Sequence, residues 1–166
     1  MSESYSFDAP RLFTVGAVGE VGARLFFIQA HAEGTTVSVK CEKQQAAALA
    51  EHLQRVLADL PVVDADEPPP LIEPLPPMDI EFAVGTISIG YDEDRDRVLL
   101  VLEEIRPDDE DDLIAEAPGS LRLRVTRSQA AAFVTQASGL VAAGRPPCRL
   151  CGQPLDPDGH VCPRLN

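Results

Sequence analysis

The sequence predicts an α+β protein, in which two strand-rich halves each end in a helix and a short tail follows. Two segments in which apolar and polar residues alternate lead into alanine-rich stretches with helical spacing. A segment with seven prolines separates them. Three of the four cysteines and one of the three histidines lie near the C-terminus. These patterns indicate strands, helices, a linker and a compact metal-binding end.

The first half, about residues 1–60, contains three predicted strands and one helix. The strands are residues 12–18, 23–31 and 35–41. The third strand alternates apolar and polar residues, which is the period-two pattern of a strand with one buried face. The helix covers about residues 43–59 and ends before Pro61, because proline cannot continue a helix.

The second half, about residues 80–144, has the same order of elements. Its strands are residues 80–91, 96–105 and 120–125, and its helix is about residues 127–143. The polar run 91–96 is expected to form a hairpin turn between the first two strands. Thr126 and Gln129 have the spacing of a capping box at the start of the helix, which ends at Gly144.

The two halves resemble each other in sequence. Residues 35–57 align with residues 119–141 without a gap, and Phe13–Gly16 resembles Phe82–Gly85. We interpret this as a degenerate internal repeat, because the shorter match comes in the same order. The alternative is that any strand followed by an alanine-rich helix gives such a likeness. The two β-β-β-α pseudo-repeats are expected to form one antiparallel or mixed sheet with two packed helices.

Two segments are expected to be irregular. Residues 61–79 hold the seven prolines, which exclude a helix or an inner strand, so we interpret them as a linker between the halves. A docking site for a partner that reads proline-rich segments is the alternative. Residues 106–118 contain the acidic run Asp108–Asp112, which is typical of a solvated loop. Residues 1–144 are thus expected to form one domain.

The tail, residues 145–166, carries the pattern C-x2-C-x8-H-x-C. Two thiolates separated by two residues grip one metal ion, because the backbone turns tightly between them. Gly152 follows at once, where such a turn favours a residue that adopts positive φ. Sulfur and imidazole donors favour structural Zn2+ in a zinc knuckle. The four candidate ligands are Cys148, Cys151, His160 and Cys162.

Other interpretations of the tail stay open. Three thiolates with Asp156, Asp158 or water as the fourth ligand would also bind zinc. A disulfide or a redox dithiol between Cys148 and Cys151 is a further alternative. Four protein ligands leave no position for a catalytic water, so we expect the zinc to be structural and to supply the folding free energy of the tail. Cys41 is expected to be a small core residue.

The charge of the chain limits its partners. The formal net charge is −13, which disfavours phosphate backbones and anionic membranes. Arginines make the tail locally basic, but no aromatic residue is interleaved for base stacking, so nucleic-acid binding is not expected. The sequence shows no secretory signal and no apolar run of roughly 18 residues that would span a membrane. We therefore expect a soluble cytoplasmic protein, in which clustered cysteines bind metal.

Glu20, Arg24 and Gln29 form a second candidate site, for a ligand in a cleft between the halves. Glycines around Glu20 would let a ligand approach the backbone. The favoured interpretation is a hairpin turn with a surface ion pair between Glu20 and Arg24, and a hydrogen-bonded core amide at Gln29. No catalytic triad, phosphate loop or catalytic carboxylate pair is recognisable, so the sequence favours a protein without enzymatic activity.

The chain resembles the bacterial domain of unknown function 3090 family over nearly its whole length. The resemblance rests on the tail, on GAVGEVGARLFFIQA (16–30), and on the helix starts EKQQAAALAEHL (42–53) and LRLRVTRSQAAAF (121–133). It implies a bacterial cytoplasmic protein, with gene neighbours that suggest a phosphorylation-linked pathway, but no reaction. We expect a non-enzymatic zinc-containing binding or adaptor protein with an unknown protein partner. The alternative is an enzyme or small-molecule binder.

Overall fold

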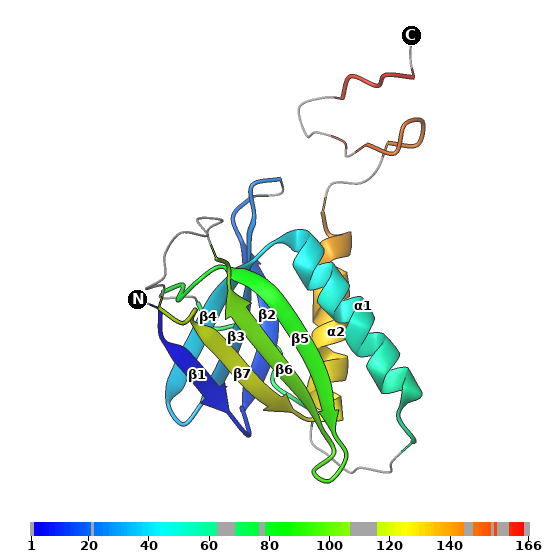
Figure 1. Ribbon diagram of the computed structural model, residues 1–166. Helices are drawn as coiled ribbons and strands as arrows, with labels where there is room; N and C mark the ends of the chain where they lie inside the picture. Colours follow the sequence, from blue (N-terminus) through cyan, green and yellow to red (C-terminus); the bar gives the residue numbers. More distant parts are fainter. Residues whose placement is uncertain are drawn as a thin grey trace.

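Figure 1 shows the computed structural model, in which residues 2–20, 22–62, 69–76, 79–106, 116–144, 148–153, 155 and 160–164 are described. The first half contains β2 (Leu12–Val18), β3 (Leu25–Ala32), β4 (Thr35–Cys41) and α1 (Lys43–Asp59). The second contains β5 (Val84–Asp92), β6 (Arg97–Glu104), β7 (Ser120–Val125) and α2 (Arg127–Ala142). The α+β class and the order of elements are confirmed. Outside the described residues lie 63–68 and 77–78 of the predicted linker and the acidic run Asp108–Asp112.

The strands form two sheets where the sequence predicted one. β2, β3 and β4 make an antiparallel three-stranded sheet. β5, β6 and β7 make a second antiparallel meander, to which β1 (Ser4–Phe7) adds in parallel beside β7. β1 was not expected from the sequence. The second sheet is therefore four-stranded and mixed, in the order β1-β7-β6-β5.

One short parallel contact joins the two sheets. Lys40 of β4 forms an isolated bridge with Ala83, and the Lys40 N–H group donates to the carbonyl oxygen of Phe82 at 2.9 Å. A bulge between Val84 and Thr86 follows immediately. A bulge bends its strand and strengthens the local twist, so β5 does not continue alongside β4. This is why the expected single sheet is divided.

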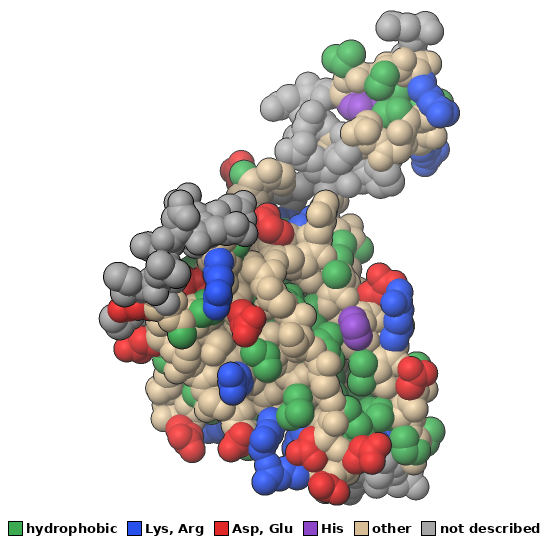
Figure 2. All heavy atoms as spheres, viewed as in Figure 1, with side chains coloured by type: hydrophobic (Ala, Val, Ile, Leu, Met, Phe, Trp, Pro, Cys, Tyr) green, Lys and Arg blue, Asp and Glu red, His purple; other side chains and the backbone are tan. Residues whose placement is uncertain are grey.

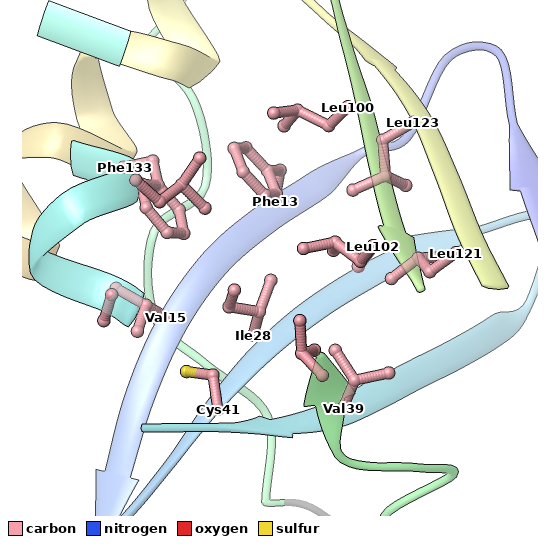
Figure 3. Close-up of a cluster of buried hydrophobic side chains, with 14 of the residues drawn as sticks. Phe13, Val15, Ile28, Val39, Cys41, Leu100, Leu102, Leu121, Leu123 and Phe133 are labelled. Carbon is pink, nitrogen blue, oxygen red and sulfur yellow. The ribbon is translucent and has the colours of Figure 1, made fainter. Parts of the chain in front are cut away.

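Both sheets and both helices share one hydrophobic core. The inward side chains of the strands meet in one buried cluster, which includes Phe13, Ile28, Val39, Leu100, Leu102, Leu121 and Leu123 (Figure 3). The ring of Phe13 in β2 stacks on that of Phe133 in α2, with centroids 4.5 Å apart and planes 6° apart. Because a strand of the first half packs against the helix of the second, the two halves are not separate cores.

The two helices lie side by side and run antiparallel (Figure 1). Lys43, the first residue of α1, lies beside Gly144, just after the end of α2. At the opposite end, the Arg127 guanidinium at the start of α2 donates to the carbonyl oxygen of Pro61, just after α1. Each helix end thus meets the opposite end of its neighbour, which suits the helix dipoles.

Each helix begins with a capping box that also ties it to the other half. In α2 the Thr126 hydroxyl accepts from the N–H group of Gln129 at 3.1 Å, which confirms the predicted box. The Gln129 amide donates to the carbonyl oxygen of Pro10, just before β2, at 2.7 Å. In α1 the Gln45 amide donates to the carbonyl oxygen of Val84 in β5 at 3.0 Å. The glutamines therefore cross-connect the two halves.

Part of the proline-rich segment covers the outer face of the three-stranded sheet. We refer to residues 69–76 as the strap. The Thr14 hydroxyl of β2 donates to the carbonyl oxygen of Ile72 in the strap at 2.5 Å. Pro74 lies over Gly16, where an added Cβ would come within 3.0 Å of the proline ring. The absence of a side chain at Gly16 therefore leaves room for the Phe27 ring, which lies nearest, and for the strap.

Gln29 holds the strap from the middle of the same face. Its side-chain amide donates to the carbonyl oxygen of Leu75 at 2.8 Å, and its side-chain oxygen accepts from the N–H group of Leu75 at 2.8 Å. The amide also donates to the hydroxyl of Ser38 at 3.0 Å. Gln29 is fully buried, so the strap satisfies a polar group that would otherwise be costly inside the protein.

A charged cluster joins the β5–β6 hairpin to the start of α2. The Tyr91 hydroxyl and the Arg127 guanidinium both donate to the Asp96 carboxylate, the latter at 2.7 Å. These bonds, with that of Tyr91 the stronger cause, lower the pKa of the Asp96 carboxyl group. Arg127 is the first residue of α2, where the helix dipole disfavours a positive charge. Asp96 supplies the compensating negative charge.

Replacing Gln29 by Leu should detach the strap. The variant leaves the backbone groups of Leu75 without their partners, so we expect a loss of about 1–3 kcal/mol in the free energy of unfolding, or release of the strap into water. Urea unfolding and limited proteolysis around residues 69–76 measure the two effects. Gln54→Leu, on the exposed side of α1, is the matched control. Equal stability and equal cleavage in both variants would contradict the proposed role of Gln29.

The Asp96→Asn variant should be less stable than the wild type at neutral pH but not at strongly acidic pH. Asn tolerates the φ of 51° at this position but carries no charge for Arg127. Because folding lowers the pKa of Asp96, its contribution is present above the unfolded value of roughly 3.9 and is lost as the pH falls through the lower folded value. Urea unfolding over this pH range measures the difference, and a difference independent of pH would refute the argument.

Candidate metal centre

A tight turn brings the first two cysteines of the tail together. The Gly152 N–H group donates to the carbonyl oxygen of Cys148 at 2.9 Å, and the Cys148 N–H group donates to that of Gln153 at 2.8 Å. Gly152 adopts a φ of 74°, in the left-handed region that glycine enters at no steric cost. The glycine thus has the positive φ that the sequence pattern predicts, and Cys151 lies inside the turn.

The four predicted ligands converge on one point. One donor atom from each of Cys148, Cys151, His160 and Cys162 lies within 4.8 Å of the other three. The sulfurs of Cys148 and Cys162 are 3.9 Å apart, and the Cys151 sulfur is 3.2 Å from Nε2 of His160. A tetrahedral ion with metal–sulfur bonds of about 2.3 Å would separate its sulfurs by about 3.8 Å. The donor set therefore fits one tetrahedral metal ion.

Backbone N–H groups prepare one of the thiols for metal binding. Those of Cys151 and, secondly, Leu150 donate to the Cys148 sulfur and lower the pKa of its thiol to about 6. At Cys151 the N–H group of Gln153 favours the thiolate, but partial burial and the sulfurs of Cys148 and Cys162 outweigh it and raise the pKa. Metal binding requires thiolates, and a bound cation removes the repulsion among them. The cluster is therefore suited to hold a cation.

The structure also addresses the disulfide and the other ligands considered for the tail. All four cysteines of the chain are free thiols. Asp156 and Asp158, the alternative ligands, lie outside the described residues. A set of four protein donors leaves no coordination position for a substrate, so the cluster is suited to a structural role.

The three residues of the second candidate site, Glu20, Arg24 and Gln29, do not lie together. Gln29 is buried under the strap, as described above. Glu20 lies in the β2–β3 hairpin, where its carbonyl oxygen accepts from the N–H group of Ala23 at 2.9 Å. Arg24 lines a separate surface cavity. Among the described residues, Glu20 and Arg24 form no ion pair.

The cavity at Arg24 has a volume of about 500 Å³. It lies where β3 begins, β4 ends and α1 begins, and its wall also includes Lys40 and Lys43. The sequence analysis did not single out these lysines, although each aligns with an arginine of the second half. Cys41 on the same wall is buried, and burial is the first cause that raises the pKa of its thiol to about 12. Cys41 is therefore a neutral core residue.

The comparisons with known proteins give one match. A family model described as a protein of unknown function (DUF3090) matches residues 5–162. The matched range includes both helices, all strands except Ser4 of β1, and all four residues of the candidate metal centre. No curated protein and no solved structure matches the chain. Within the part of the chain that the structure describes, no helix has the length and apolar character needed to cross a membrane.

Replacing His160 by Gln should lower the metal content of the purified protein. The wild-type chain is expected to retain about one metal ion after dialysis against a weak chelator, because four donors share the ion. The variant lacks the imidazole and should lose most of the metal. Elemental analysis per chain measures the content. His52→Gln, on the exposed side of α1, is the matched control. Equal metal content in both variants would remove His160 from the site.

Proposed function

The chain belongs to the DUF3090 family, and we propose that it is a non-enzymatic binding protein whose tail, closed by a structural zinc ion, presents a contact surface to a protein partner. The observation that carries the proposal is the convergence of Cys148, Cys151, His160 and Cys162. A closed set of four donors fixes the shape of a short segment and offers no site for chemistry. A fixed shape without chemistry supports a binding role.

Zinc is the ion that this donor set favours. Thiolates and imidazole are soft and borderline ligands, and their tetrahedral arrangement is typical of structural Zn2+. Within the described part of the tail, the buried side chain is that of Cys162, itself a ligand. The metal would therefore supply the folding free energy that apolar burial does not. The proposal requires a reducing compartment, such as the bacterial cytoplasm, because oxidised cysteines do not bind metal.

Two exposed apolar side chains beside the ligands support a contact surface. Val161, which lies between two ligands in the sequence, is 95% exposed, and Leu150, next to a third, is 50% exposed. The charged residues in the described part of the tail are Arg149 and Arg164. Figure 2 shows apolar and basic side chains on the tail and scattered acidic side chains on the rest of the molecule. An apolar and basic surface of this kind is typical of protein contacts.

The variant Val161→Ser distinguishes the role of the contact surface in partner binding from the role of the metal. It should retain zinc, because Val161 is not a ligand, but it should lose the partner. Val62→Ser is the matched control, because Val62 is 98% exposed on the body of the protein. Cys148→Ser should lose both zinc and partner. Elemental analysis gives the zinc content, and affinity capture from cell extract with quantitative mass spectrometry gives the bound proteins.

Two outcomes would contradict the proposal. The same captured proteins with Val161→Ser, Cys148→Ser and the wild type would remove the tail from partner binding. Much less than one equivalent of zinc in wild-type protein purified without added metal, with its thiols still free, would remove the zinc.

A further inference from the structure

We propose that the cavity at Arg24 binds a small molecule that carries a phosphate group. Its volume of about 500 Å³ lies within the roughly 300–1,000 Å³ of small-molecule sites. Its wall combines the β2–β3 connection, β3, β4 and α1 with Gly144 at the end of α2, so both halves build it. This site is separate from the metal centre and from the surface proposed for a protein partner.

The cavity has an excess of positive charge. Arg24, Lys40 and Lys43 line it, against the one carboxylate of Glu42. Glu42 is the N-cap of α1, and its carboxylate faces a backbone N–H group of its own helix in the capping box. Within the described residues, none of the three cations forms an ion pair. Three unpaired cations on a chain with a net charge of −13 form a local site for an anion.

In the second half, the residues equivalent to Lys40 and Lys43 are arginines that form ion pairs. Lys40 and Arg124 are each the second-last residue of the strand before the helix, in β4 and β7. Lys43 and Arg127 are each the first residue of the helix that follows. Arg124 forms an ion pair with Asp8 at 3.6 Å, and Arg127 is held by the hairpin carboxylate described above. Arg124 and Arg127 are thus each paired with a carboxylate of the same chain.

The hairpins explain the difference between the halves. Asp96, which precedes β6, neutralises the first residue of α2. The residue that precedes β3 is Arg24, which adds a third cation to the cavity instead of an acid. The first half therefore has a cation, Arg24, at the position where the second half has the carboxylate of Asp96. A bound anion would supply the missing negative charge.

A phosphate monoester matches this site in charge and in shape. It carries about −1.5 to −2 charges at neutral pH, which matches three cations against one carboxylate. The arginine guanidinium binds phosphate oxygens in a bidentate manner, and lysines add point charges. Leu25 and Phe26 on the same wall give the site an apolar side. The site is therefore suited to a phosphate joined to an apolar or aromatic body.

Phenyl phosphate is a suitable probe, because it combines a phosphate monoester with an aromatic ring. The full-length chain would be titrated with it at constant ionic strength, while NMR follows the backbone amides. We expect saturable shifts confined to residues 22–26, 40–43 and 144. Lys40→Gln and Arg24→Gln should each weaken binding about tenfold, the loss expected for one charged hydrogen bond. Lys43 is left unchanged, because it also contacts the end of α2.

Arg124→Gln is the matched control, because it removes one positive charge at the equivalent position of the second half. It should bind phenyl phosphate as the wild type does. An equal loss in Arg124→Gln and Lys40→Gln would show only general electrostatic attraction and would overturn the site. Shifts that are scattered and do not saturate would overturn it as well. Equal affinity for benzoate would overturn the assignment to phosphate. Thermal unfolding of each variant confirms that the fold is retained.

Discussion

The packing of α2 against β2 makes the two halves one molecule. Phe13 of the first half stacks on Phe133 of the second, at the centre of a cluster to which both sheets contribute. Close packing of this kind is sensitive to single side chains, because a buried aromatic ring removed from a core costs several kcal/mol. The glutamine bonds of the two capping boxes reinforce the same contact, since each joins the start of one helix to the other half. The cavity, the strap and the cross-connections all depend on this arrangement.

The outer face of the three-stranded sheet is buried in part by the proline-rich segment, which therefore has a structural role. The inner face packs in the core, and the strap covers the outer face through Thr14 and Gln29. Sequence analysis reads such a segment as a linker, because proline excludes helices and inner strands but leaves contacts of this kind open. The signal that the sequence did contain is Gln29, a polar residue within an apolar run. Its burial is stable because the strap backbone supplies its hydrogen bonds.

The sequence predicted the features that depend on residues close together in the chain. The bounds of β2, β4, β7 and α1 agree with the sequence analysis, because periodicity and caps define them. The convergence of the four cysteine and histidine residues of the tail was predictable for the same reason, since they lie close together in the chain. β1 was missed although Ser4–Phe7 alternates polar and aromatic residues, because four residues give a weak local signal and the strand forms through pairing with distant β7. The division into two sheets was not predictable either, because it depends on the bulge between Val84 and Thr86, which ends the short contact between Lys40 and Ala83.

Charged side chains with a partner inside the fold differ from those that are suited to bind a ligand. Where a charge serves the fold, the chain supplies its partner, as Asp96 does for Arg127 and Asp8 for Arg124. Two clusters of described residues gather groups that favour the same sign of charge. The tail gathers thiols, one of which favours its anionic form, and the cavity gathers cations. Charges of one sign held close together repel each other, and a bound ion of the opposite sign removes this repulsion. A cation in the tail and an anion in the cavity are therefore inferred on the same physical ground.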